Sequence, residues 1–269
     1  MDILPLLILL VLGTAAGAIN AAVGSGSLFT LPVLIALGVP PGTAVRTNTL
    51  GILFSTIGSV AGFRREIAAD RAGIGPVSIL AVIGAMTGAC LLLVSPPGAL
   101  EIVVPILIVA ALVLVVFQKR IAAAIRSRQD RSREHRVPPG REVVERHPYR
   151  RPALVASMGA ASLYGGYFTA AQGVLYMAIL SALSGRSLSE VNPVKNWLSL
   201  LVNAAAVLVY LVAHLVWGAE ILWIASAAIA VGALLGGYFG ARLAKKLPDP
   251  VLRGAIVVVA LVALVRHVL

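Results

Sequence analysis

The chain has 269 residues, of which 59% are hydrophobic and only 12% charged, and it carries a formal net charge of +11. Soluble domains contain about 25% charged residues, so this composition argues against an ordinary soluble domain. The mean hydropathy is +0.96, and apolar stretches of about 20 residues, enough to cross a hydrocarbon core of about 30 Å, recur along the chain. We therefore expect an all-α polytopic membrane protein.

The N-terminal stretch Met1–Pro5 lacks the basic region that opens a signal peptide, so we expect the first apolar stretch to stay as a span. The single cysteine, Cys90, lies in an apolar stretch, and we interpret it as a small core residue. The expected apolar segments are 3–23, 27–38, 44–62, 73–94 and 99–118, then 153–170, 173–184, 196–216, 220–241 and 250–268.

Positive charge is concentrated between the two sets of segments. Residues 119–151 contain eleven Lys or Arg and four Asp or Glu, and so supply +7 of the +11. Because positive loops stay cytoplasmic, we expect a basic cytoplasmic linker here, in contact with anionic lipid. Nucleic-acid binding is not expected, since Tyr149 alone offers an aromatic ring among the basic residues.

The two sets of segments correspond at a nearly constant spacing. Gly26 and Gly173 are 147 residues apart and Asn48 and Asn196 are 148 apart; Gly84 and Gly88 precede Gly232 and Gly236 by 148. Agreement at distant positions indicates an internal duplication. We predict a first repeat at 1–118 and a second at 152–269, each a broken or re-entrant helix pair followed by three spans, with eight to ten segments in all.

Loop charges favour an inverted relation between the repeats. The basic loops at 63–72 and 242–253 are both cytoplasmic only if the second broken pair re-enters or crosses an even number of times. Segments 27–38 and 173–184 have 12 residues each, about 18 Å of helix and too short to span. Inverted repeats with broken helices are a common transporter plan, with the site at mid-membrane. Parallel repeats with eight full spans remain an alternative.

The breaks supply the first candidate binding residues. Ser25, Gly26 and Ser27 open one short helix, and Gln172 and Gly173 open its counterpart. Free amides at a helix N-terminus favour an anion, and irregular backbone is tolerated inside a membrane where it lines a cavity. The alternative is that the glycines only permit close helix packing.

Two polar clusters supply the remaining candidates, namely Arg46, Thr47 and Asn48 in the first repeat and Lys195 and Asn196 in the second. Their side chains suit the oxygen atoms of an anion. Alternatively, the asparagines cap helices and the cations lie at the membrane interface.

No Asp or Glu lies in the middle of a predicted span, although proton-coupled pumps usually place one there. His214 lies within a span, where a packed histidine is favoured over a proton relay. Phosphate-loop, metal-ligand and nucleophile–base patterns are absent from the sequence. We therefore expect neither an enzyme nor a bound cofactor or metal. A membrane potential, negative inside, drives an anion outward by about 2.3 kcal/mol per 100 mV, so anion export needs no coupling ion.

Two stretches carry a resemblance to a known family: GTAAGAINAAVGSGSLFTLPVLIALGVPPGTAVRTNTL and IAVGALLGGYFGARLAKKLPDPVLR. Both are similar to the sulfite exporter family TauE/SafE, whose two repeats each open with a glycine-rich break, a proline and a short Thr-Ser-type cluster. The first cluster here reads Arg46-Thr47-Asn48, and the second, Asn192-Pro193-Val194-Lys195, keeps only the lysine of the usual Thr-Ser-Lys. The second break is reduced to Ala171-Gln172-Gly173.

The resemblance implies transport of sulfite or other small organosulfur anions, such as sulfonates, across a bacterial inner membrane, usually outward. Two alternatives come from other classes: a membrane scaffold or assembly factor acting through the basic linker, and a carrier for a cation or neutral solute. A homo-oligomer is compatible with the sequence, since the face formed by Gly232, Gly236 and Gly240 suits subunit contacts as well as internal packing.

Overall fold

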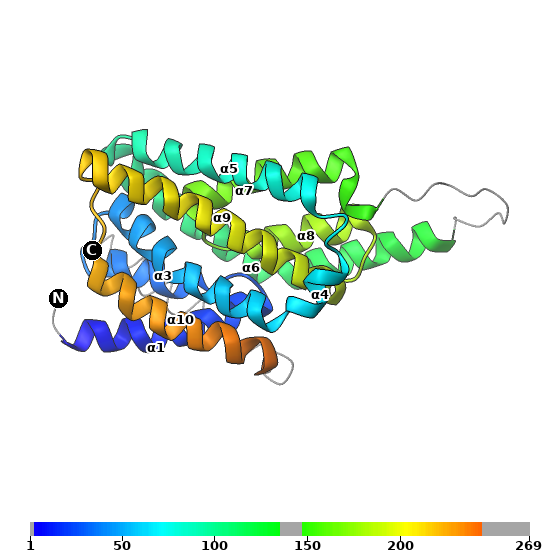
Figure 1. Ribbon diagram of the computed structural model, residues 1–269, viewed down its shortest axis with the longest axis horizontal. Helices are drawn as coiled ribbons and strands as arrows, with labels where there is room; N and C mark the ends of the chain where they lie inside the picture. The colour runs from blue at the N-terminus through cyan, green and yellow to red at the C-terminus, as the bar shows by residue number, and fades with distance from the viewer. Residues whose placement is uncertain (1–2, 135–146, 244–269) are drawn as a thin grey trace.

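The computed structural model describes residues 3–134 and 147–243, and every regular element in these ranges is a helix. The predicted segment 250–268 lies outside the described residues. Figure 1 shows the long helices lying roughly side by side. The elements are α1 (Ile3–Ala22), α2 (Ser27–Ala36), α3 (Pro41–Gly62), α4 (Arg64–Ala69), α5 (Gly75–Val94), α6 (Pro97–Glu134), a 3-10 turn η1 (Pro148–Arg150), α7 (Pro152–Phe168), α8 (Gln172–Ser184), α9 (Leu188–Trp217) and α10 (Trp223–Leu243).

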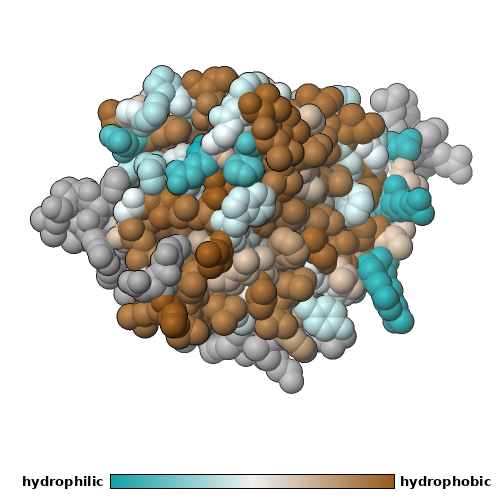
Figure 2. Space-filling model, turned by 60° about the vertical axis from the view of Figure 1, so that its left-hand side comes forward, coloured by the Kyte–Doolittle hydropathy of each residue, from teal (hydrophilic) through white to brown (hydrophobic). Residues whose placement is uncertain are grey.

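Among the described residues, five helical stretches are long and apolar enough to cross a membrane: α1, α5, Pro97–Phe117 of α6, α9 and Trp223–Gly240 of α10. Helices α2 and α8 are shorter and apolar. Large hydrophobic side chains such as Ile79, Ile102 and Leu215 are exposed, and Figure 2 shows hydrophobic residues over most of one face. An exposed apolar surface of this extent suits contact with lipid, as expected for a polytopic membrane protein.

Three features differ from the sequence-based expectations. Helix α9 begins at Leu188, because Ser187 and Glu190 form a capping box that starts the helix before residue 196. Helix α6 continues to Glu134, into the predicted linker, where Ala, Arg, Lys and Gln are strong helix formers. Cys90 is exposed on α5, so its interpretation as a core residue was wrong. A thiol is apolar enough to face lipid.

Glycines allow two helix pairs to pack with their backbones in close contact. A Cβ atom on Gly232 or Gly236 of α10 would overlap the carbonyl oxygen of Leu10 or Thr14 of α1. In the same way, a Cβ on Gly88 of α5 would overlap the carbonyl oxygen of Leu163 in α7. The glycine face of α10 is therefore occupied by α1, which is internal packing.

These contacts define two bundles. The first bundle contains α1, α2, α3 and α10, and the second contains α5, α7, α8 and α9; α3 and α9 pack against each other between them. Each bundle takes one helix from the other half of the chain, because α10 packs with α1 and α5 packs with α7. Chain crossovers at α3–α5 and α9–α10 link the bundles.

The two broken helix pairs enter from opposite ends of the molecule (Figure 1). We call the end where η1 and the α8–α9 connection lie the linker end, and the end where α3 starts the far end. Helix α1 starts at the far end and runs alongside α10. Helix α2 then returns toward the far end, where α3 starts. Helix α7 starts at the linker end, and α8 returns to it, where Arg151 donates to the Leu183 carbonyl at 3.0 Å. The hairpins α1–α2 and α7–α8 therefore approach each other within the protein.

Candidate functional site

The first hairpin turns at a glycine. Helix α1 ends at Ala22, and Gly24 has a φ of +85°, a left-handed conformation that favours glycine. The amides of Val23 and Gly24 both donate to the Ile19 carbonyl. Gly26 then lies against the backbone of Ala16, where a side chain would not fit. Small residues at these positions let α2 fold back along α1.

The second hairpin turns without glycine. Thr169 has a φ of 63° and Ala171 a φ of 56°, and such left-handed residues cost about 1–3 kcal/mol each. Two hydrogen bonds hold the turn: the Tyr164 hydroxyl donates to the Ala170 carbonyl at 2.7 Å, and the hydroxyls of Thr49 and Thr169 are 2.8 Å apart. This strained turn is fixed by α3 and α7 rather than by local preference.

The two turns are in direct contact. The Gly173 amide donates a hydrogen bond to the Gly24 carbonyl at 3.1 Å, and a Cβ atom on either glycine would overlap the backbone of the other. The amide that we predicted as an anion donor therefore has a protein acceptor in this conformation. The two predicted breaks do come together, and they close on each other.

Lys195 lies fully buried beside the first turn. Its Nζ atom donates to the carbonyls of Asn20 at 2.9 Å and Ala21 at 3.4 Å, and to Asn196 Oδ1 at 3.0 Å. The side-chain nitrogen of Asn196, Nδ2, also donates to the Ala21 carbonyl, at 3.2 Å. These carbonyls are the unpaired C-terminal groups of α1, whose partial negative charge favours a cation. Lys195 and Asn196 thus terminate α1 at its break.

Within the part of the chain that the structure describes, Lys195 has no buried carboxylate beside it. Among the described residues the buried carboxylate is that of Asp70, at the linker end and outside the spans. A buried ammonium in apolar surroundings is costly unless paired. Neutral carbonyls compensate a positive charge only in part, so an additional negative charge would stabilise the protonated form of Lys195.

Apart from His147 Nδ1 at the linker end, four buried polar atoms lack a hydrogen-bond partner within the part of the chain that the structure describes: Ser25 Oγ, Asn48 Nδ2, Gln172 Oε1 and Asn203 Oδ1. Such an unpaired group costs about 1–3 kcal/mol, and each one needs a physical reason. Three of the four belong to the predicted site. The Asn48 side chain also accepts a hydrogen bond from the Thr30 hydroxyl through Oδ1, which leaves its amide hydrogens for another acceptor.

The other predicted residues have different surroundings. Ser27 is buried at the first position of α2. Thr47 accepts a hydrogen bond from the Leu222 amide at 3.1 Å, and Arg46 donates to the Glu220 carbonyl at 2.9 Å. Arg46 and Thr47 therefore attach α3 to the α9–α10 crossover at the far end. These two contacts lie at the crossover and not at the hairpin turns. His214 Nδ1 lies 2.8 Å from the Ala219 carbonyl, beside the Trp223 ring.

Two buried polar residues, Asn20 on α1 and Asn203 on α9, were not predicted from the sequence. Asn20 donates to Ser55 Oγ at 3.2 Å, and Asn203 lies seven residues after Asn196 on α9, which places both on one face. Asn203 also follows Ser55 by the same 148-residue spacing that related the repeats. That spacing, applied to every polar residue in a span, would have found it.

Comparison with known proteins decides the family. The sequence profile of the family Sulfite exporter TauE/SafE matches residues 9–267. The chain belongs to this family. It is therefore a multi-pass membrane protein of a transporter family, and the resemblance found in the sequence is confirmed.

Curated relatives of this TauE/SafE chain carry transporter names. It is 24% identical over 247 residues to "Probable membrane transporter protein YfcA" of Escherichia coli (strain K12), covering 92% of this chain and 83% of that protein. It is 24% identical to "Probable membrane transporter protein ORF9" of Sinorhizobium sp, with 93% and 87% covered, and to "Probable membrane transporter protein" of Haemophilus influenzae, with 95% and 91% covered. No solved structure matches significantly.

Proposed function

We propose that this TauE/SafE protein carries small anions, with sulfite or an organic sulfonate as the substrate, by alternating access through the two hairpin turns. The observation that supports this most is Lys195, a fully buried lysine with no buried carboxylate beside it among the described residues, at the meeting point of two interrupted helices. A negative solute compensates its charge. A cationic solute would be repelled from it, so we favour an anion over the cation alternative.

The substrate's oxygen atoms would bind the unpaired donors near the turns. Ser25 and Asn48 supply side-chain donors from the first bundle. When the turns separate, the Gly173 amide loses the Gly24 carbonyl as its acceptor and becomes free for a substrate oxygen, together with the positive dipole end of α8. In this proposal the closed contact between the turns is the empty state, and substrate replaces it.

We further propose that the repeats are inverted. Helix α1 corresponds to α7, α3 to α9 and α5 to α10 at the 148-residue spacing, and the two hairpins enter from opposite ends. The exchange of α5 and α10 between bundles has the same form in both halves. Rocking of one bundle against the other about the α3–α9 contact would expose the turns alternately to the two ends.

Charge indicates the orientation. The linker end carries Arg64, Arg65 and Arg71 as well as Arg150 and Arg151, and positive segments stay cytoplasmic. We place this end in the cytoplasm and the protein in the bacterial inner membrane. A potential, negative inside, then drives an anion outward by about 2.3 kcal/mol per 100 mV.

The experiment is flux in proteoliposomes under an imposed potential. We expect labelled sulfite or methanesulfonate to move toward the positive side, and its direction to reverse with the potential. Asn48→Ala and Asn196→Ala should reduce the initial rate, while Thr87→Ala, which removes an exposed hydroxyl on α5 bonded only within its own helix, should not. Movement of chloride alone, or of neither sulfur anion, would contradict the proposal.

The scaffold alternative has a separate test. Residues 135–146 of the basic linker lie outside the described residues. Deleting residues 121–146, which keeps His147, should leave sulfite flux intact if the protein is a carrier, whereas a scaffold would lose its cellular role.

A further inference from the structure

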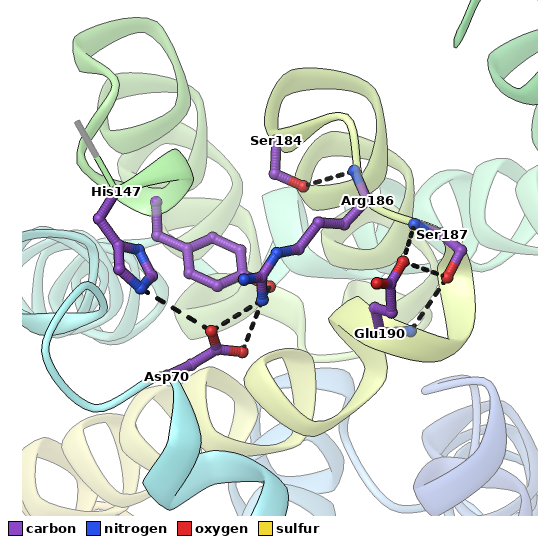
Figure 3. A network of polar contacts seen from close by, with 7 residues as sticks. Asp70, His147, Ser184, Arg186, Ser187 and Glu190 are labelled. Carbon is purple, nitrogen blue, oxygen red and sulfur yellow. Dashed lines mark hydrogen bonds and ion pairs between the residues drawn. The ribbon is translucent and has the colours of Figure 1, made fainter. Parts of the chain in front are cut away.

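A cluster of polar contacts joins two connections at the linker end (Figure 3). Asp70 lies on the α3–α5 crossover and Arg186 on the α8–α9 connection, and the sequence separates them by 116 residues. Arg186 Nη1 donates to both carboxylate oxygens of Asp70, at 2.7 and 2.8 Å. We call Asp70, Arg186, Tyr149 and His147 the linker-end clamp.

The clamp is a well-packed ion pair rather than a loose surface contact. Asp70 is buried, and charge-assisted hydrogen bonds of this length are about twice as strong as neutral ones. The Arg186 guanidinium also lies over the Tyr149 ring, 5.1 Å from its centroid, and donates to the Tyr149 hydroxyl at 3.3 Å. Burial raises the pKa of Tyr149, so the hydroxyl stays neutral beside the carboxylate. His147 Nε2 lies 3.8 Å from Asp70.

The backbone around Arg186 is held from both sides. Ser181 Oγ donates to the Arg186 carbonyl at 2.7 Å, and the Arg186 amide donates to Ser184 Oγ at 3.2 Å. Ser187 and Glu190 then cap α9 directly after it (Figure 3). These contacts fix the backbone that carries Arg186, which limits the backbone entropy lost in forming the pair.

The position of the clamp connects it to hairpin movement. Arg186 follows the C-terminal end of α8 at the linker end. Asp70 follows α4, where the chain crosses from the first bundle to the second. Any opening of the linker end between the α7–α8 hairpin and this crossover must separate the two side chains. The far end shows a matching arrangement: Arg46 and Thr43 of α3 bond the carbonyl and carboxylate of Glu220 in the α9–α10 crossover.

We propose that the Asp70–Arg186 pair is the gate at the linker end, which must break for the hairpin turns to become accessible from that side. This gate rests on the alternating-access mechanism under "Proposed function". It does not depend on which anion is carried. In this proposal, the far-end contacts of Glu220 have the same role on the opposite side.

The test uses two buried reporter positions on the same helix, in a Cys90→Ala background. Val191 of α9 lies one turn from the clamp and Ala213 near the far end, and both are fully buried. Purified protein in nanodiscs carrying Val191→Cys or Ala213→Cys is treated with a membrane-impermeant maleimide, without substrate. With the clamp intact, we expect slow labelling of both.

Neutralising either partner, by Asp70→Asn or Arg186→Gln, should speed labelling of Val191→Cys by about tenfold or more as the open population rises, and should leave Ala213→Cys slow. Arg65→Gln, at an exposed arginine of α4 at the same end, is the matched control and should change neither. The charge swap Asp70→Arg with Arg186→Asp should restore slow labelling of Val191→Cys.

Three results would overturn the gate: unchanged labelling of Val191→Cys in both neutral variants, equal acceleration at both reporters, or a charge swap that fails to restore protection. The second would show a general loosening of the fold. Failure of sulfite flux in the parent protein would count against the proposed substrate and leave these labelling results as a separate finding.

Discussion

The Gly24 carbonyl accepts a hydrogen bond from the Gly173 amide at 3.1 Å, so that two helix breaks 149 residues apart are joined backbone to backbone. A transporter with its site at this junction must separate the two glycines in each cycle. Lys195, which terminates the first of the two broken helices, is held beside this junction by the carbonyls of Asn20 and Ala21.

Gly24→Ala should impair folding and transport more than Gly38→Ala. Both glycines are left-handed, with φ of +85° and +82°, but the new methyl would overlap Gly173 only at position 24, since nothing lies within 4 Å of it at position 38. The left-handed φ alone costs an alanine about 1–2 kcal/mol, whereas a backbone overlap displaces α8. Thermal unfolding in detergent and sulfite flux measure the two effects. Equal loss in both variants would argue against a tight junction.

Ala171→Gly should stabilise the protein. Ala171 has a φ of 56°, and glycine relieves the left-handed strain, by about 1 kcal/mol. Ala170→Gly is the matched control, because both alanines are fully buried and lose the same methyl group, whereas position 170 is not left-handed and gains no relief of strain. We expect the melting temperature to rise in the first variant and to fall in the second. An equal fall in both would mean that the turn is not strained.

Thr49→Val should destabilise the second hairpin turn. The change removes the Thr49 hydroxyl, which lies 2.8 Å from the buried Thr169 hydroxyl and is its hydrogen-bond partner. An unpaired buried hydroxyl costs about 1–3 kcal/mol. The double variant Thr49→Val with Thr169→Val removes both hydroxyls and should recover part of the loss. Chemical denaturation of the parent, the two single variants Thr49→Val and Thr169→Val, and the double variant forms a double-mutant cycle, and additive losses would exclude a coupling between the two threonines.

Asn203→Leu should lower the transport rate without lowering the stability of the protein. Asn203 Oδ1 is buried without a partner, so replacing the amide by an apolar group of similar size removes a cost of about 1–3 kcal/mol. If Asn203 contacts substrate in the open states, flux should fall while thermal stability stays equal or rises. A drop in stability with unchanged flux would make the residue a structural one.

The sequence was sufficient to predict the broken helices, because glycine, proline and a short apolar length leave a distinct pattern. It predicted the start of α8 to within one residue. It did not predict that Gly24 and Gly173 close on each other, since a contact between two turns depends on tertiary packing that no local pattern encodes. It also missed the Asp70–Arg186 pair, because each residue alone looks like an ordinary loop charge.

The polar clusters illustrate the same limit. Arg46, Thr47 and Asn48 are adjacent in sequence and were treated as one unit, but successive helix positions point about 100° apart. Asn48 faces Thr30 of the first hairpin, whereas Arg46 and Thr47 face the α9–α10 crossover. The alternation of apolar and polar residues along the sequence cannot separate these faces, because the helix is buried on several sides.

The initial rate of potential-driven sulfite flux in Lys195→Met proteoliposomes is the most direct test of the central claim. Methionine keeps much of the length of the side chain and removes the buried charge. We predict a rate lower by about tenfold or more, since a charged hydrogen bond contributes about 1.5–3 kcal/mol, with Thr87→Ala at the parent rate. A Lys195→Met protein that folds and moves sulfite as fast as the parent would contradict an anion site at the junction of the two hairpins.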